Sequence, residues 1–298
     1  MRFKFIIKKW ANFYFFVQNL SEWHPRAVKH YNLFWKKRLG KFSLKEEKAL
    51  RSFKKIRKNY EIGQTFFEVA FFVSNNPWRV LKDKLSLKEY KKMREIFNLF
   101  ENKFGLIYKK DLPLLRRWKK FLENKTNEFN KQSLLKEIIR VLSILYNTQP
   151  KIKEINVYLL LSSSDCTSGT AKTIDNQSIT ICVSCFPIEQ AHSVLGGMWH
   201  EICHLVFEEE YFMPLIRRNF PDLLKGEMPL YEIALLSLFP AGVLGQKFFK
   251  SPPPNSSYFG AFSQKSSQFL SLMEEYVLQK KPLNKEYLRK LASLITKK

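Results

Sequence analysis

Apolar side chains in residues 1–150 recur at three- and four-residue spacing, with lysines between them. This pattern is typical of helices that bury one face. Residues 43–46 and residues 86–89 both read Ser-Leu-Lys-Glu, and a Ser followed three residues later by Glu predicts a capping box that opens a helix. Turn-forming residues interrupt the pattern at residues 24–25, 40, 75–77, 111–113 and 147–150. We therefore expect a basic, all-helical N-terminal region over residues 1–150.

The pattern changes after residue 150. Residues 155–161 form a short apolar run and residues 178–183 alternate with a period of two, and both patterns are typical of strands. The segment between them is rich in turn formers. Helical patterns follow at residues 188–210, 230–239, 263–279 and 284–296, with a loop that contains Pro214, Pro221 and Pro229. The sequence thus predicts a mostly helical α+β fold, with a second domain at residues 151–298 built on a small mixed or antiparallel sheet.

Charge is distributed unevenly between the two parts. The chain has 51 Lys and Arg against 27 Asp and Glu; residues 1–150 carry 35 of these basic and 13 of these acidic side chains. Such a surplus attracts nucleic acid or an anionic membrane without specificity. The lysines are scattered along helix faces and form no arginine-rich block, so a solvated surface is the simpler interpretation. Charge alone assigns no partner.

Neither the cysteines nor the N-terminus indicates export. The four cysteines include one CxxC pair, at residues 182–185, and a zinc ribbon would need a second pair; we expect reduced thiols in the core. Lys8 and Lys9 interrupt the apolar N-terminus, and no run reaches the ~20 residues of a membrane span. The first helix should dock on the core or lie on a membrane surface. We expect a cytoplasmic protein without a transmembrane segment, with a membrane-peripheral location as the alternative.

Residues 200–204 read His-Glu-Ile-Cys-His inside the predicted helix 188–210. Residues four apart lie one turn above each other on a helix, so His200 and His204 direct two imidazoles at one point and supply two of the four ligands of zinc. Glu201 is rotated by about 100° from His200, which leaves its carboxylate beside the metal as a proton acceptor. With so few histidines, roughly 0.006 matches to this motif are expected by chance. Gly196 and Gly197 predict a close approach of another backbone or of substrate.

A catalytic zinc site needs a third protein ligand. Glu232 is the best candidate because it is the only acid in the apolar helix 230–239, and a buried carboxylate needs a cation. The competitors are acids at the end of the motif helix, acids in the following loop, and one cysteine: Glu208, Glu209, Glu210, Asp222, Glu227 and Cys185. Among them, Glu208 could brace His204. Cys185 would indicate a deformylase-like site, but the Glu-Gly-Cys segment of such sites is absent.

Residues 155–242 resemble the gluzincins, the metallopeptidases that pair an HExxH helix with a glutamate ligand on a following helix. The likeness is strongest at residues 197–206, where the motif has uncharged flanks. Gly197 stands where Val or Thr is more usual in the group. Leu236 and Ser237 stand where the group often has a supporting acid.

The resemblance implies a zincin-like core in which one Zn²⁺ ion is held by His200, His204 and Glu232, with Glu201 as the general base. It also implies an edge strand that aligns the substrate backbone, for which the candidates are Gly169, Thr170 and Ala171, or the run 178–183. The group uses a Tyr or His to donate to the transition state. Tyr258, which follows the proline-rich segment 251–257, is the candidate here.

The sequence therefore predicts a zinc metallopeptidase that hydrolyses peptide or protein substrates with a metal-activated water. Two alternatives stay open. The fold could bind metal without peptidase activity, or hydrolyse something else. Residues 1–150 could instead form a basic helical module that contacts nucleic acid or anionic membrane.

Overall fold

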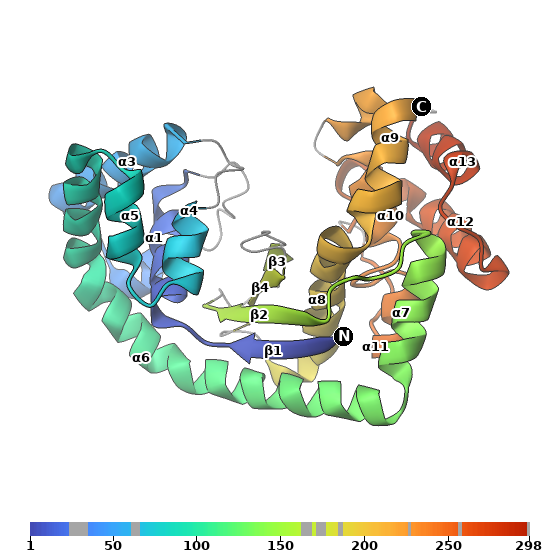
Figure 1. Ribbon diagram of the computed structural model, residues 1–298, viewed down its shortest axis with the longest axis horizontal. Helices are drawn as coiled ribbons and strands as arrows, with labels where there is room; N and C mark the ends of the chain where they lie inside the picture. Colours follow the sequence, from blue (N-terminus) through green and yellow to red (C-terminus); the bar gives the residue numbers. More distant parts are fainter. Residues whose placement is uncertain are drawn as a thin grey trace.

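The computed structural model describes residues 1–23, 35–60, 66–161, 169–170, 177–183, 187–225, 228–255 and 258–296 (Figure 1). Its longest helix, α6 (Leu87–Lys131), runs along one side of the molecule, and two groups of helices lie at its two ends. A small sheet lies between them. We refer to the two groups as the first lobe and the second lobe.

The first lobe gathers helices from the first half of the chain at the beginning of α6. They are α1 (Lys9–Ser21), α3 (Leu44–Lys58), α4 (Phe66–Glu68) with a π-helical turn at Val69–Val73, and α5 (Pro77–Lys84). Its core is aromatic, since Phe13 stacks on Phe104 at 4.3 Å between ring centroids and Tyr14 stacks on Phe71 at 4.7 Å. The buried face of α1 confirms that this helix docks on the core.

The second lobe gathers the helices that follow α6. They are α7 (Leu134–Leu145), α8 (Ala191–Val206), α9 (Met213–Asn219), α10 (Leu230–Leu236), α11 (Val243–Phe249), α12 (Ser266–Gln279) and α13 (Lys285–Thr296). Shorter helical turns lie at Ile188–Gln190, Glu208–Phe212, Pro221–Leu224 and Gly260–Lys265. No helix in the described residues is both long enough and apolar enough to cross a membrane.

The sheet has the strand order β1-β2-β4-β3. Its strands are β1 (Arg2–Ile6), β2 (Glu154–Leu160), β3 (Gly169–Thr170) and β4 (Ser178–Cys182). Strands β1, β2 and β4 run parallel to one another, and the two-residue β3 is antiparallel to β4. The antiparallel alternative for the sheet is therefore wrong. The predicted strands 155–161 and 178–183 are confirmed within one residue.

Residues 2–6 correct the expectation of an all-helical region before residue 150. They form β1, in which Phe5 lies opposite Val157 of β2. Lys8 and Lys9 follow directly, and α1 starts there. A parallel partner about 150 residues away is invisible to local pattern, and pairing with it outweighs any helical tendency of these five residues. The division of the chain at residue 150 stays a prediction.

Helix starts agree with the sequence better than helix interruptions do. Both capping boxes are confirmed: Ser43 and Ser86 each accept the N–H of the Glu three residues on, whose carboxylate accepts the N–H of the Ser. The break expected at residues 111–113 is wrong, because α6 continues through Pro113. Burial of Leu115 and Trp118 beside it offsets the ~3 kcal/mol that an interior proline costs. The loop expected at residue 214 is also wrong, since Pro214 lies in the first turn of α9, where proline is tolerated.

Candidate metal centre

Helix α8 carries the HExxH motif and packs on the edge of the sheet formed by β4 and β3. Its apolar side chains, among them Trp199, Ile202 and Cys203, are buried. Gly196 allows the turn after α10 to approach, because a Cβ at this position would lie 2.6 Å from Cα of Pro240. The close approach predicted from the glycines is thus confirmed at Gly196; no atom of the described residues lies within 4 Å of a Cβ placed at Gly197. This contact fixes the segment after α10 against α8.

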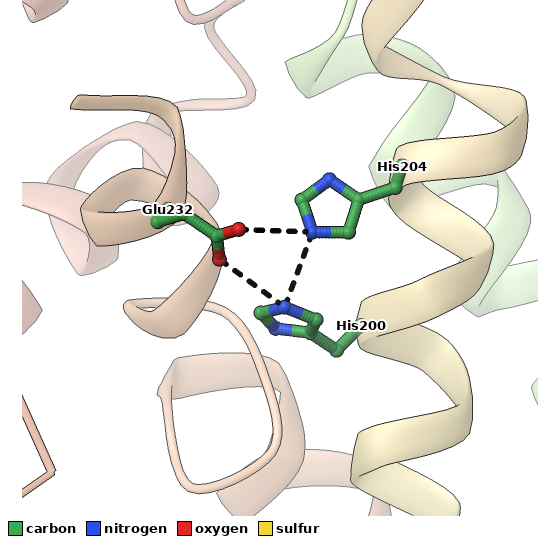
Figure 2. A group of neighbouring side chains, drawn as sticks. All are labelled: His200, His204 and Glu232. Atoms are coloured by element: carbon green, nitrogen blue, oxygen red, sulfur yellow. Dashed lines mark hydrogen bonds and ion pairs between the residues drawn. The ribbon is translucent and has the colours of Figure 1, made fainter. Parts of the chain in front are cut away.

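Three side chains from these two helices meet at one point, as Figure 2 shows. Nε2 of His200 lies 3.2 Å from Nε2 of His204. The Glu232 carboxylate oxygens lie 3.4 Å from Nε2 of His200 and 3.6 Å from Nε2 of His204. Each of the three side chains keeps 13 to 19% of its surface exposed. The structure therefore brings together the three predicted ligand residues on a partly open surface.

The distances between these atoms fit a tetrahedral ion. Donors about 2.0–2.1 Å from a tetrahedral ion lie about 3.3–3.4 Å from one another. The two Nε2 atoms, 3.2 Å apart, are close to that value, and each lies 3.4 or 3.6 Å from a different oxygen of the Glu232 carboxylate. Two imidazole nitrogens and a carboxylate oxygen suit a divalent transition metal, with a fourth position left for solvent or substrate.

Both imidazoles are held from behind by hydrogen-bond acceptors. Nδ1 of His200 lies 3.4 Å from the carbonyl oxygen of Phe239, and Nδ1 of His204 lies 2.7 Å from Oε2 of Glu208. A carbonyl or a carboxylate can only accept, so each Nδ1 carries the hydrogen. The lone pair of each neutral ring then lies on Nε2, the atom that faces the other two side chains. The expected bracing of His204 by Glu208 is confirmed as a contact.

The electrostatics of the cluster are dominated by carboxylates. Burial acts to lower the pKa of His204, but the hydrogen bond and charge of Glu208, and the charges of Glu232 and Glu201, raise it to about 9. In the metal-free protein this imidazole is therefore protonated at neutral pH. A cation is already favoured at this point of the molecule, as a proton or as a metal ion.

Glu201 is buried on α8, one residue after His200. Its charge contributes to the raised pKa of His204, so the carboxylate lies close to the cluster without belonging to the group of three. This is the placement expected for a residue beside a metal and not on it.

The hydroxyl of Tyr258 is hydrogen-bonded to the main chain on both sides of residue 240. Its hydroxyl donates to the carbonyl of Leu236 at 3.1 Å and accepts the N–H of Ala241 at 3.0 Å. Burial raises the pKa of this phenol far above its usual value. These hydrogen bonds tie down the segment between α10 and α11, and the role of Tyr258 as a transition-state donor stays a prediction.

The other residues predicted for the site either lie in the described part of the chain or fall outside it. Glu209, Glu210 and Asp222 are exposed and belong to no group of potential ligands in the described residues. Glu227 and Cys185 lie outside the described residues, as does Ala171. Gly169 and Thr170 form β3, at the edge of the sheet. Of the four cysteines, Cys182 and Cys203 are buried free thiols as expected.

Two tyrosines near the site were not predicted. The ring of Tyr231 lies edge-on to His204, with 5.8 Å between centroids. Tyr146, from the end of α7, is fully buried, and burial together with the nearby Cys203 and Glu208 raises the pKa of its phenol. Tyr231 adjoins Glu232 in sequence, so a signal existed there. No local pattern connects residue 146 with α8.

Comparisons with known proteins give no family for this chain. No family model, no curated protein and no solved structure matches it. The cluster of His200, His204 and Glu232, which could hold a metal ion, is therefore the feature that indicates a function.

Proposed function

We propose that this protein is a zinc-dependent peptidase with a zincin-like core, in which His200, His204 and Glu232 hold the ion. The observation that carries the proposal is the convergence of the three side chains, whose facing atoms lie 3.2 to 3.6 Å apart, together with the HExxH spacing. Zinc is chosen over other ions because two imidazoles and one carboxylate, with an open fourth position, are its usual catalytic ligands.

A divalent ion bound here would act as a Lewis acid, which acidifies a water molecule and polarises a scissile carbonyl. The protein supplies the proton transfers. Glu201, buried beside the cluster, takes a proton from the attacking water and delivers it to the leaving amine. Phe239 and Glu208 keep both imidazoles in the tautomer that leaves Nε2 available. Simple metal storage needs no general base beside the ion. The presence of Glu201 at this position therefore supports peptide hydrolysis.

A peptide substrate would be aligned by the edge of the sheet. β3 is the edge strand next to β4, and it contacts α8. An extended peptide can add to such an edge through main-chain hydrogen bonds. Gly169 and Thr170 are therefore the proposed substrate-binding residues, with Ala171 as their continuation.

The test is Glu201→Gln, assayed on a fluorogenic peptide library, with zinc content measured by mass spectrometry of the purified protein. We expect about one equivalent of zinc in the wild type and the variant, and a roughly 10²- to 10⁴-fold loss of turnover in the variant. Glu209→Gln, an exposed acid just beyond the same helix, is the matched control and should keep full activity.

Three results would reject the proposal. A wild-type protein that binds zinc but cleaves no peptide, with or without added metal, would be a metal-binding protein of another function. Equal cleavage by wild type and Glu201→Gln would remove the proposed base. Peptide cleavage that survives complete chelation would exclude the metal.

A further inference from the structure

A groove in the first lobe lies between α3 and the beginning of α6, away from the metal centre. The two helices run antiparallel, because Lys103 pairs with Glu46 near one end while Asn59 donates to Glu89 near the other. Two adjoining hollows of about 760 and 310 Å³ lie along them and share Lys92 and Glu95. From residue 45 to residue 59 the groove follows 14 helical residues, or about 21 Å at 1.5 Å per residue.

The walls of this groove are cationic and its floor is apolar. Ala49, Ile56 and Ile96 are buried along the floor. Among the described residues, five wall lysines are exposed and form no ion pair. They are Lys45, Lys48, Lys55, Lys88 and Lys91.

The acids of the groove are already engaged. The Glu89 carboxylate accepts hydrogen bonds from Tyr60, Asn59 and Ser86, which, against the effect of burial, hold its pKa below the usual value. Glu95 pairs with Lys92 at 3.0 Å. Glu89 keeps its charge, but the five wall lysines outnumber it, so the groove presents a net positive field to whatever enters it.

We propose that this groove docks an acidic segment of a partner polypeptide, with carboxylates on the lysine walls and apolar side chains on the floor. Charge complementarity selects an anionic partner. The apolar floor selects one that also carries apolar side chains, which a phosphodiester backbone does not offer. The length of the groove suits about six extended residues, or about four turns of helix.

Other anionic partners fit the groove less well. Its lining residues, all within the described part of the chain, include no aromatic ring on which a base could stack and no arginine for bidentate phosphate recognition. A planar bilayer cannot follow a concave surface to its floor. The chemistry of an acidic, partly apolar peptide matches both walls and floor.

The experiment measures binding of a fluorescein-labelled peptide of about eight residues, composed of alternating Glu and Leu pairs, to the full chain by fluorescence anisotropy. We compare wild type with a groove variant that carries Lys55→Gln, Lys88→Gln and Lys91→Gln. The matched control carries Lys109→Gln, Lys110→Gln and Lys136→Gln, three exposed lysines outside the groove. Removal of three contacting cations should weaken binding about tenfold or more, whereas the control should change it less than twofold.

Three further arms separate the proposal from its rivals. Peptide binding should persist after chelation and in His200→Ala. The groove proposal can therefore fail or succeed independently of the proposed metal centre. Raised salt should weaken it. A single-stranded oligonucleotide, or vesicles of phosphatidylserine and phosphatidylcholine, that bind more tightly than the peptide and lose affinity in the groove variant would overturn the proposal in favour of nucleic acid or membrane. Equal peptide binding by all three proteins would overturn it outright.

Discussion

Each lobe contains a cluster of charged side chains, and the two clusters are built differently. In the first lobe Arg57 and Glu68 are buried and oppositely charged, with 3.6 Å between Nη2 and Oε1. The guanidinium lies 4.0 Å from the ring centroid of Phe67 and 4.2 Å from that of Trp23. In the second lobe three carboxylates, Glu201, Glu208 and Glu232, all act on one imidazole.

The two clusters differ in their balance of charge. Arg57 and Glu68 neutralise each other, and aromatic faces solvate the guanidinium through cation–π contacts. The carboxylates of the second lobe outnumber the charges of the imidazoles they surround, so His204 gains a proton at neutral pH. The charges of the first cluster balance each other in the folded chain, whereas the second has an excess of negative charge that a proton or a metal ion can balance.

Arg57→Leu should have the largest effect on stability. It removes the guanidinium that lies 3.6 Å from the buried Glu68, and removal of one partner of a buried ion pair costs about 3–5 kcal/mol. The free energy of unfolding, measured by urea denaturation of the metal-free protein, should fall by that amount. Arg57→Leu combined with Glu68→Leu should recover much of the loss, because no unpaired charge remains. A double variant no more stable than the single one would show that the pair does not form a self-contained cluster.

Zinc should stabilise the second lobe by a comparable amount. A ligand at about 1,000 times its Kd stabilises the folded state by ~4 kcal/mol, so the wild-type unfolding temperature should rise when zinc is added. His200→Ala should abolish the shift, because two ligands are too few. Arg57→Leu should keep it, since its cluster lies in the other lobe and distant effects add. A zinc shift that survives in His200→Ala would place the ion elsewhere.

The contrast between the clusters also marks what local sequence can predict. The HExxH spacing indicated two candidate ligands on one helix, and Glu232 stood out as a lone acid in an apolar helix; both features are local. Arg57 and Glu68 carry no such signal, since their partnership depends on how α3 and α4 pack. The same limit explains β1, whose partner lies about 150 residues away, and Tyr146, which reaches α8 from the end of α7.

The pH dependence of metal-free stability should expose the protonated His204. Its folded-state pKa, about 9, lies above the usual 6.5, so protonation favours the folded state. The stabilisation is fully present below about pH 6.5 and is lost as pH rises through about 9, with an upper bound of roughly 3 kcal/mol. Unfolding of the metal-free wild type and of His204→Gln, measured across this window, should show the loss only in the wild type. Zinc affinity should run the opposite way and rise with pH, because zinc must displace this proton. A flat stability profile in the wild type would contradict the raised pKa.

Glu208→Gln should give the smallest effect. The amide keeps the size of the side chain and can still accept from Nδ1 of His204 through its oxygen, but the charge that supports the ligand is gone. Loss of such a supporting carboxylate weakens metal binding by about 10- to 100-fold. The Kd for zinc, measured by competition with a chromophoric chelator, should rise by that factor. The first lobe, which contains the Arg57–Glu68 cluster, should stay folded. Glu210→Gln, an exposed acid two residues further on, is the matched control and should bind zinc as the wild type does. If both variants bound zinc equally well, the hydrogen bond at 2.7 Å would orient the ring only in the metal-free protein, and the excess of negative charge would not be what draws the ion to this lobe.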